Sequence, residues 1–359
     1  MNLFFDLLQV ALGTREAMGA LPGSREEWEE LFKNAGKHNL LGITFPVIDR
    51  LHDETEIPLS VYSRWALMKE RVQQKNARLN AECGKLYRQL AADGLKSCVL
   101  KGQSLAVLYP RPELRQCGDI DIWIEGGFWT VYNYFNARYE ITNVFYHQCD
   151  VKLDKGVNLE PHYTPSWMNS PCADRRLQKY FARKAPEQFA NFDERLGFAV
   201  PTLRFNAVYL LIHIYRHVLD EGIGLRQLLD YYYLLKALSP EDRTFALGEL
   251  RELHLGSFAA GVMHVLKTVF LASDEILLCP PDERQGEFLV EEIMISGNFG
   301  RYDERNRHSK HESRLMHAKR KLTRSLRYLE YYPGEVLGIP LFMVRHYFWR
   351  RRRGVLKKV

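Results

Sequence analysis

The chain has 359 residues, of which 46% are hydrophobic and 26% charged, and its formal net charge is +6. These proportions are typical of a folded protein with a sizeable core, and no run approaches the roughly 20 apolar residues of a membrane-spanning helix. The six cysteines show no CxxC pair or zinc spacing, so we expect reduced thiols and a cytoplasmic protein.

The first 94 residues have the apolar periodicity of helices. Helices are expected at residues 2–12, 25–36 and 61–90. The apolar opening stretch contains Asp6 and lacks a basic leader, which favours an amphipathic helix over a signal peptide. The third helix should end at Asp93–Gly94, because glycine is common just after a helix. We therefore predict an N-terminal helical region over 1–94.

The pattern changes to short apolar runs separated by turn residues in the centre of the chain. Strands are expected within 97–102, 119–124, 140–147, 150–153 and 157–163, and helices within 104–110 and 128–139. The turn signal Asp154-Lys155-Gly156 predicts a hairpin between the last two strands. These elements predict an α+β core over 95–185, with a small mixed sheet and helices on one side.

The remainder, residues 186–359, is expected to be a helical region with a basic tail. Helices are expected at 204–219, 225–237, 240–253, 256–272, 287–295 and 311–331. His213 and His217 share a helix face, and a zinc site there is less favoured than a structural role or a place in the acceptor pocket. Arg226 and Asp230 are also four residues apart and are predicted to pair. The polar cluster 298–311 favours a surface loop, with a phosphate- or acceptor-facing segment as the alternative.

The basic charge of the chain is concentrated at the C-terminal end. Residues 301–359 contain 17 Lys and Arg and five Asp and Glu, whereas the first 300 residues carry a net charge of −6. The final segment joins an apolar-aromatic stretch to the four arginines 350–353. We expect a packed helix with a basic end there, and peripheral contact with a membrane surface or a phosphate clamp are the alternatives.

A pair of aspartates marks the predicted strand 119–124, which reads DIDIWI. Side chains alternate across a strand, so Asp119 and Asp121 share one face and three isoleucines occupy the other. Two adjacent carboxylates repel each other, and a divalent cation relieves the repulsion because it binds hard oxygen ligands. Mg²⁺ is typically held by one or two carboxylates together with substrate phosphates. A solvated strand edge is the alternative interpretation of this pair.

Neighbouring segments favour the metal interpretation. In LKGQS, a strand runs into Gly102 and a short helix, and the first amides of a helix bind phosphate. Lys101 and Ser104 would add a charge and a hydroxyl, and Arg111 and Arg115 follow as further phosphate-binding candidates. Downstream, VNLEPHY places Asn158, Glu160 and His162 on one strand face, and Glu160 can supply a third carboxylate.

The segment LKGQSLAVLYPRPELRQCGDIDIWI, followed by NLEPHY, resembles the bacterial uncharacterised nucleotidyltransferase family of the DNA polymerase β-like superfamily. The helical stretch 210–235 extends the resemblance, which covers roughly residues 30 to 300. Two features depart from the superfamily pattern. Gln103 separates the glycine from Ser104, and the gap to Asp119 is longer, which suggests that the insert forms its own loop and brings Arg115 over the phosphates.

The resemblance implies a nucleotidyltransferase core and a site. Asp119, Asp121 and Glu160 would hold Mg²⁺ or Mn²⁺, and an NTP such as ATP would bind its phosphates on the turn at Gly102 and Ser104, with Lys101 and Arg115. An acceptor hydroxyl or phosphate would attack the α-phosphate and pyrophosphate would leave. Glu160 or His162 would help to deprotonate the acceptor.

Three functions are open at this point. The first is transfer of an NMP group to a small molecule, a glycan precursor or a protein side chain. The second is a catalytically silent relative that binds a nucleotide or a partner. The third is a nucleic-acid-modifying enzyme, which is disfavoured because the basic region lacks a nucleic-acid-binding motif. The acceptor and the oligomeric state do not follow from the sequence.

Overall fold

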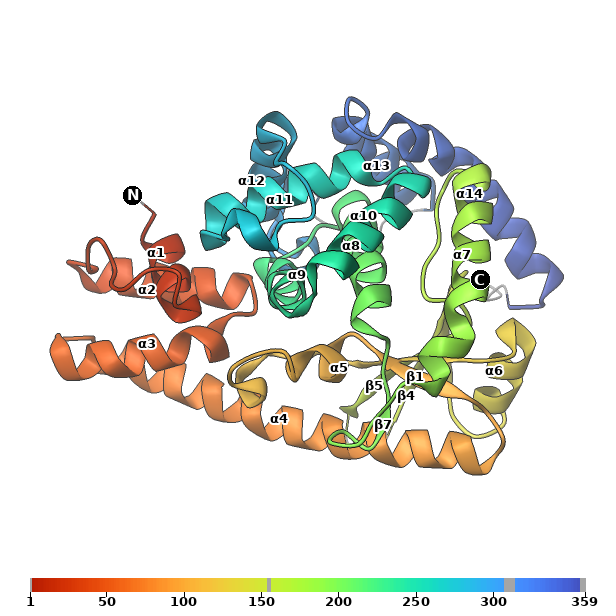
Figure 1. Cartoon of the computed structure of the whole chain (residues 1–359), viewed down its shortest axis with the longest axis horizontal. Helices are drawn as coiled ribbons and strands as arrows, with labels where there is room; N and C mark the ends of the chain where they lie inside the picture. The colour runs from red at the N-terminus through yellow and green to blue at the C-terminus, as the bar shows by residue number, and fades with distance from the viewer. Residues whose placement is uncertain (1, 154–155, 307–313, 356–359) are drawn as a thin grey trace. The chain divides into compact units, whose positions relative to one another are not determined.

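A five-stranded mixed sheet belongs to one of two compact units in the computed structural model, which describes residues 2–153, 156–306 and 314–355 (Figure 1). The strands are β1 (Ser97–Leu100), β2 (Ile120–Ile124), β3 (Ile141–Val144), β4 (Cys149–Lys152) and β5 (Asn158–His162). Their order is β1-β2-β5-β4-β3; β2 and β5 are parallel, and the other neighbours are antiparallel. The predicted α+β class and small mixed sheet are confirmed. Asp154 and Lys155 of the predicted hairpin turn lie outside the described residues.

Strand β2 is buried on both of its faces. The three isoleucines on one face have exposures of 1% or less. On the other face, the indole of Trp123 packs against the rings of Phe181, Phe189 and Phe205, with ring centroids 4.9 to 6.2 Å apart. Asp121 lies on this second face, two residues before the indole. An apolar cluster therefore borders the acidic position.

Helices and a small hairpin complete the unit that contains the sheet. They are α5 (Gly102–Ala106), α6 (Gly127–Asn136), α7 (Pro171–Ala190), α13 (Arg314–Ser325) and α14 (Pro333–Arg352), with the two-stranded hairpin β6 (Phe192–Asp193) and β7 (Phe198–Ala199). The sequence did not predict α7, which carries Pro186 in its interior. The predicted helix 311–331 is shorter, since α13 ends at Ser325; residues 311–313 lie outside the described part.

A second, helical unit is built around a large apolar core. Its helices are α1 (Leu3–Leu12), α2 (Arg25–Lys37), α3 (Leu41–Glu54), the first part of α4 (Leu59–Ala92), most of α8 (Leu203–Asp220), α9 (Leu225–Ala237), α10 (Pro240–Glu252), α11 (Gly256–Phe270) and α12 (Glu283–Ser296). Short 3-10 turns lie at Pro112–Leu114, Asp274–Ile276, Asn298–Gly300, Glu304–Asn306 and Leu326–Tyr328. The Ser24 hydroxyl caps α2 by accepting a hydrogen bond from the backbone N–H of Glu27. The sequence did not predict α3, which contains Pro46.

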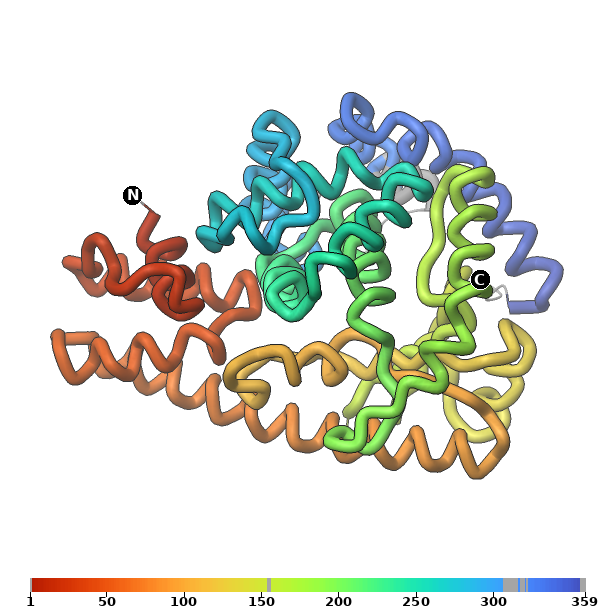
Figure 2. The backbone as a smooth tube through the Cα atoms, viewed as in Figure 1, coloured from red at the N-terminus to blue at the C-terminus, as the bar shows by residue number. Residues whose placement is uncertain are grey.

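The two units are interleaved along the chain. The helical unit combines Met1–Arg78, Leu105–Cys117 and Asn206–Arg305, and the sheet unit combines Leu79–Ser104, Gly118–Phe205 and Asn306–Val359. The division expected at residues 94 and 185 follows chain order, whereas each compact unit draws on three separate stretches. Figure 2 traces this path and shows α4 as one continuous coil that contributes to both units.

Two further expectations concern the surface of the chain. Of the polar cluster 298–311, residues 307–311 lie outside the described part, and the segment before them forms two 3-10 turns. Among the helices in the described ranges, none is long and apolar enough to span a bilayer.

Candidate active site

The pairing of β2 with β5 assembles the acidic centre. In this parallel pair, Asp121 lies opposite Glu160, and Trp123 lies opposite His162. Parallel neighbours in register present their side chains on the same face of the sheet. Asp121, Glu160 and His162 therefore converge, and one potential ligand atom from each lies within 4.8 Å of the others. Among the described residues, this is the group of His, Cys, Asp and Glu with metal-binding geometry.

The carboxylate of Asp121 is buried and held by two partners on the same oxygen. Lys101 Nζ lies 2.8 Å from Oδ1, and His162 Nε2 lies 3.0 Å from it. Burial alone would raise the pKa of Asp121, but the Lys101 charge and the His162 hydrogen bond outweigh it and hold this pKa well below its ordinary value. Asp121 is therefore the fixed negative charge of the centre.

Glu160 shows the opposite behaviour. Its side chain is half-buried, and burial together with the charges of Asp121 and Asp119 raises the pKa of Glu160 well above its ordinary value. This is the expected outcome when two carboxylates share one site, because the second to ionise must do so beside an existing negative charge. Without a cation, Glu160 is thus the carboxyl that retains a proton most readily.

His162 joins the centre through its ring. Burial lowers the pKa of His162 despite the hydrogen bond to Asp121, so the imidazole is neutral at neutral pH. Since Asp121 is ionised, we infer that Nε2 carries the proton and donates it to Oδ1. A hydrogen bond of this kind fixes the orientation of the carboxylate that accepts it.

Asp119 lies just before β2 and is half-buried. The sequence placed it in the metal centre with Asp121 and Glu160. In the structure, the group within 4.8 Å consists of Asp121, Glu160 and His162, and Asp119 lies outside this group. Its charge nevertheless raises the pKa of Glu160, so it acts on the same centre electrostatically.

The turn between β1 and α5 has an unusual backbone. Lys101 and Gly102 have φ angles of 48° and 40°. A left-handed conformation costs a non-glycine residue about 1–2 kcal/mol, and the ion pair with Asp121 helps to offset that cost at Lys101. The backbone N–H and the hydroxyl of Ser104 both donate to the Lys101 carbonyl, at 2.8 and 2.7 Å. Ser104 therefore closes the turn itself.

The turn also lies against the start of β2. A Cβ added at Gly102 would come within 3.7 Å of the Asp119 carbonyl oxygen. Gln103, the residue that departs from the superfamily pattern, is buried, and its side-chain oxygen lies 3.9 Å from the Cys83 sulfur on α4. The extra residue thus anchors the turn to a helix, and sequence spacing had no signal for this contact.

Arg115 lies in the helical unit with a buried partner. Its Nε and Nη2 atoms bind the two oxygens of Asp230 at 2.7 and 2.6 Å, and Nη1 lies 2.8 Å from the Cys117 sulfur. Tyr109 donates its hydroxyl to the same carboxylate at 2.6 Å. The guanidinium that the sequence assigned to phosphate binding is therefore 1% exposed and engaged within the protein.

The predicted pairing of Arg226 with Asp230 is wrong. Asp230 binds Arg115 and Tyr109, and Arg226 donates instead to the Gln116 carbonyl at 2.9 Å. Helical spacing indicated a local ion pair, but a partner 115 residues away in the sequence has the better bidentate geometry.

The two histidines of α8 lie against each other. The rings of His213 and His217 are 4.2 Å apart and edge to face. His217 Nδ1 lies 2.7 Å from the Glu221 carboxylate, and Arg216 pairs with Asp220 at 2.5 Å. These contacts favour the structural interpretation of the pair over the zinc alternative.

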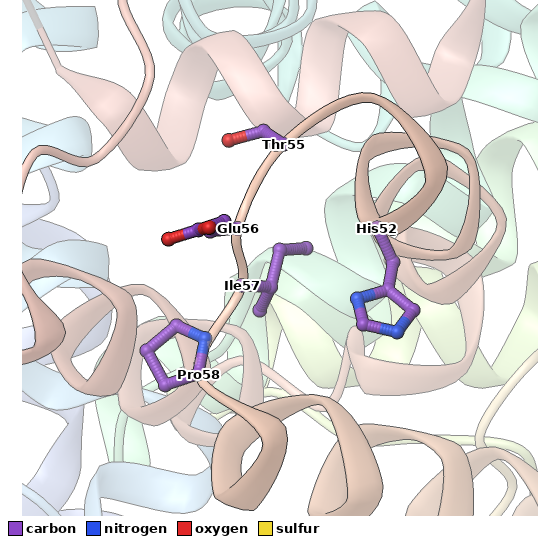
Figure 3. Close-up of a pocket in the computed structure, with 5 residues that line it drawn as sticks. All are labelled: His52, Thr55, Glu56, Ile57 and Pro58. Carbon is purple, nitrogen blue, oxygen red and sulfur yellow. The ribbon is translucent and has the colours of Figure 1, made fainter.

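A surface hollow of about 460 Å³ lies in the helical unit. It is lined by His52, Thr55, Glu56, Ile57 and Pro58, and Figure 3 shows that these residues follow one another from the end of α3 into the turn before α4. The His52 ring stacks on Tyr62 with centroids 4.0 Å apart. None of the predicted site residues lines this hollow.

Comparison with known proteins now identifies the chain's relatives. A sequence model of a family described as uncharacterised nucleotidyltransferase matches residues 24–270, which is more than half of the chain. The chain belongs to this family. The match confirms the resemblance carried by the segments from LKGQS to NLEPHY.

Among solved structures, an antigenic nucleotidyltransferase-like protein from Paracoccidioides brasiliensis is similar to the chain at 14% identity. The match covers 54% of this chain and 93% of that one, with a TM-score of 0.29. A comparison with curated proteins found no match.

The residues of the acidic centre fit a divalent cation. Asp121 and Glu160 offer two hard oxygen ligands side by side, and burial together with the neighbouring carboxylate charges raises the pKa of Glu160, a repulsion that a cation would relieve. His162 can act either as a nitrogen ligand or as the donor that orients Asp121. Because magnesium prefers oxygen ligands, the hydrogen bond from His162 to Asp121 favours the orienting role.

Replacement of Glu160 by glutamine is expected to stabilise the metal-free protein at neutral pH. A carboxyl with a raised folded-state pKa destabilises the folded protein once the pH exceeds its unfolded value, because its ionised form is disfavoured after folding. The melting-temperature difference between Glu160→Gln and wild type in EDTA should therefore be largest at pH 7–8 and vanish below pH 4.5, the ordinary value for this group.

Glu125→Gln is the matched control for this measurement. Glu125 is exposed, directly follows β2 and pairs with Lys96 at 3.6 Å. Its substitution should change stability little at any of these pH values. A Glu160→Gln difference that stays constant from pH 4.5 to 8 would contradict the assigned environment of Glu160.

Proposed function

We propose that this chain transfers an NMP group from an NTP to an acceptor hydroxyl or phosphate in a Mg²⁺-dependent reaction. The observation that carries the proposal is the β2–β5 register, which sets the carboxylates of Asp121 and Glu160 side by side. Family membership supports the reaction class. Such a centre is what nucleotidyl transfer needs, because two carboxylates can hold the divalent ion that accompanies a triphosphate.

Different residues of the site would bind the metal, orient its ligand and bind the phosphates. Asp121 and Glu160 would hold Mg²⁺ or Mn²⁺, which when bound neutralises charge on the phosphates. His162 keeps the Asp121 carboxylate ionised and oriented. The Gly102 turn supplies backbone N–H groups beside Asp119, and Lys101 supplies a positive charge at the same turn.

Deprotonation of the acceptor hydroxyl requires a base within hydrogen-bonding distance of it. His162 is 1% exposed, whereas the Glu160 side chain is half-buried and open to a bound substrate. We therefore assign the proton-accepting role to Glu160 rather than His162.

The proposal is tested by incubating the protein with each α-labelled NTP, Mg²⁺ or Mn²⁺, and a filtered extract as the source of acceptors. We expect label on an acceptor and release of pyrophosphate in step with it. The Glu125→Gln control should retain this activity. Label transfer that is insensitive to EDTA would contradict the metal-dependent reaction.

One contact favours the second candidate, a silent nucleotide-binding relative. Lys101 Nζ lies 2.8 Å from the same Asp121 oxygen that a cation would approach. In a silent relative, this ion pair would replace the cation permanently. Thermal shifts distinguish the two: a magnesium-dependent increase in melting temperature with NTP supports the enzyme, and an NTP shift without any magnesium dependence or label transfer supports the silent relative.

A further inference from the structure

One face of the C-terminal helix α14, dark blue in Figure 1, packs against other residues of the sheet unit. The buried carboxylate of Glu335 accepts the backbone N–H groups of Asn169 and Ser170 at 2.7 and 3.2 Å. Arg345 pairs with Asp174 at 3.1 Å, and Trp349 packs on the rings of neighbouring aromatic residues. These contacts fix which face of the helix is turned outward.

The outward face of α14 is apolar over three turns. Leu337, Leu341, Val344 and Phe348 are 67%, 59%, 58% and 49% exposed. Their spacing of four, three and four residues places them in one row along the helix, which we call the outer stripe. A helix on the surface of a globular protein normally turns its polar face outward, so this arrangement is the reverse of the usual one.

Positive charge continues the outer stripe at the end of the helix. Arg351 and Arg352, three and four residues after Phe348, are exposed. The segment 314–355 contains 11 Lys and Arg but two Asp and Glu. One of those two acids, Glu335, is buried on the inner face. The outer stripe of α14 is thus followed by exposed arginines at the end of the same helix.

The apolar row and the arginines together indicate which kind of partner binds this face of α14. Apolar side chains flanked by arginines match the boundary between acyl chains and anionic headgroups, where both features are satisfied at once. A second copy of the chain would offer apolar surface but the same positive charge, which opposes pairing in the parallel orientation. No helix in the described ranges can span a bilayer, so the match is to a helix that lies on the membrane surface.

We propose that the outer stripe and the adjoining arginines of α14 bind the surface of an anionic lipid bilayer. The helix lies in the interface with Leu337, Leu341, Val344 and Phe348 at the acyl boundary. The arginines at its end contact lipid phosphates. This site is separate from the acidic centre on β2 and β5, and its test does not depend on the transfer reaction.

Flotation of the full-length protein with vesicles tests the proposal. Vesicles of phosphatidylcholine alone are compared with vesicles that contain 30% phosphatidylglycerol, at low and high salt. We expect binding to the anionic vesicles at least about 10-fold stronger than to the neutral ones, and weaker binding at high salt, since headgroup charge attracts each arginine. Equal binding to both vesicle types, or no binding to either, would overturn the proposal.

Matched variants distinguish lipid binding by the outer stripe from nonspecific binding by other exposed apolar side chains. Leu341→Asp/Val344→Asp should abolish flotation, whereas Leu59→Asp/Leu67→Asp, which changes exposed leucines of α4 that are 71% and 50% exposed, should not. All these positions are exposed, so melting temperatures should stay close to wild type. Light scattering completes the test: a wild-type dimer that Leu341→Asp/Val344→Asp converts to a monomer would assign the stripe to self-association and overturn the proposal.

Discussion

Asp121→Asn is expected to lower nucleotidyl transfer at least about 100-fold, the scale on which a single electrostatic group acts in an active site. The substitution keeps the size of the side chain but removes the charge that Lys101 and His162 hold in place. Label transfer from NTP, measured with and without Mg²⁺, reports the effect. Transfer within a few-fold of wild type would contradict the role of Asp121.

A loss of folding must be separated from a loss of chemistry in this experiment. Asp121→Asn leaves Lys101 without its charged partner, and the Lys101 side chain is 14% exposed. The double variant Lys101→Met/Asp121→Asn removes both charges and should recover most of the stability but none of the activity. Glu125→Gln, at the exposed end of the same strand, should keep both.

Asp230→Ala is expected to destabilise the protein by about 3–5 kcal/mol, the usual cost of removing one partner of a buried ion pair. The variant leaves the Arg115 guanidinium buried without the carboxylate that binds two of its nitrogens. Urea unfolding measures the change. The double variant Arg115→Met/Asp230→Leu should recover most of the loss, because an apolar pair of similar volume needs no charge partner.

An exposed ion pair in the same loop provides the control. Arg111 and Glu113 lie 3.2 Å apart with side chains 52% and 43% exposed. Glu113→Ala should therefore change the free energy of unfolding by less than about 1 kcal/mol. NTP affinity also distinguishes the two roles of Arg115: we expect Arg115→Met/Asp230→Leu to bind NTP as wild type does, whereas a phosphate-binding arginine would lose affinity on substitution.

The sequence predicted the elements around the acidic centre because its local signals are strong there. Alternating side chains placed Asp121 on one face of its strand, and the same rule put Glu160 and His162 on one face of theirs. The register between β2 and β5 could not be predicted, because it depends on tertiary pairing between strands about 40 residues apart. That register sets Asp121 opposite Glu160 and brings His162 to the same centre.

Long-range contacts also explain the other differences. Arg115 was assigned from its position near the aspartates, but its charge is satisfied by Asp230 on α9, and no spacing rule connects the two. Helices α3 and α7 escaped prediction because Pro46 and Pro186 lie inside them. Proline removes one helical hydrogen bond, and packing of the flanking turns can compensate for the loss in a folded protein.

The interleaved path of the chain has a consequence for biosynthesis. The helical unit needs residues as far as Arg305, and the sheet unit draws on a final stretch that begins at Asn306. A ribosome must therefore translate most of the message before either unit can close its core, although individual helices form earlier. Half-made chains will expose apolar surface for most of translation, and a premature stop within the last third should yield a species that proteases and chaperones recognise.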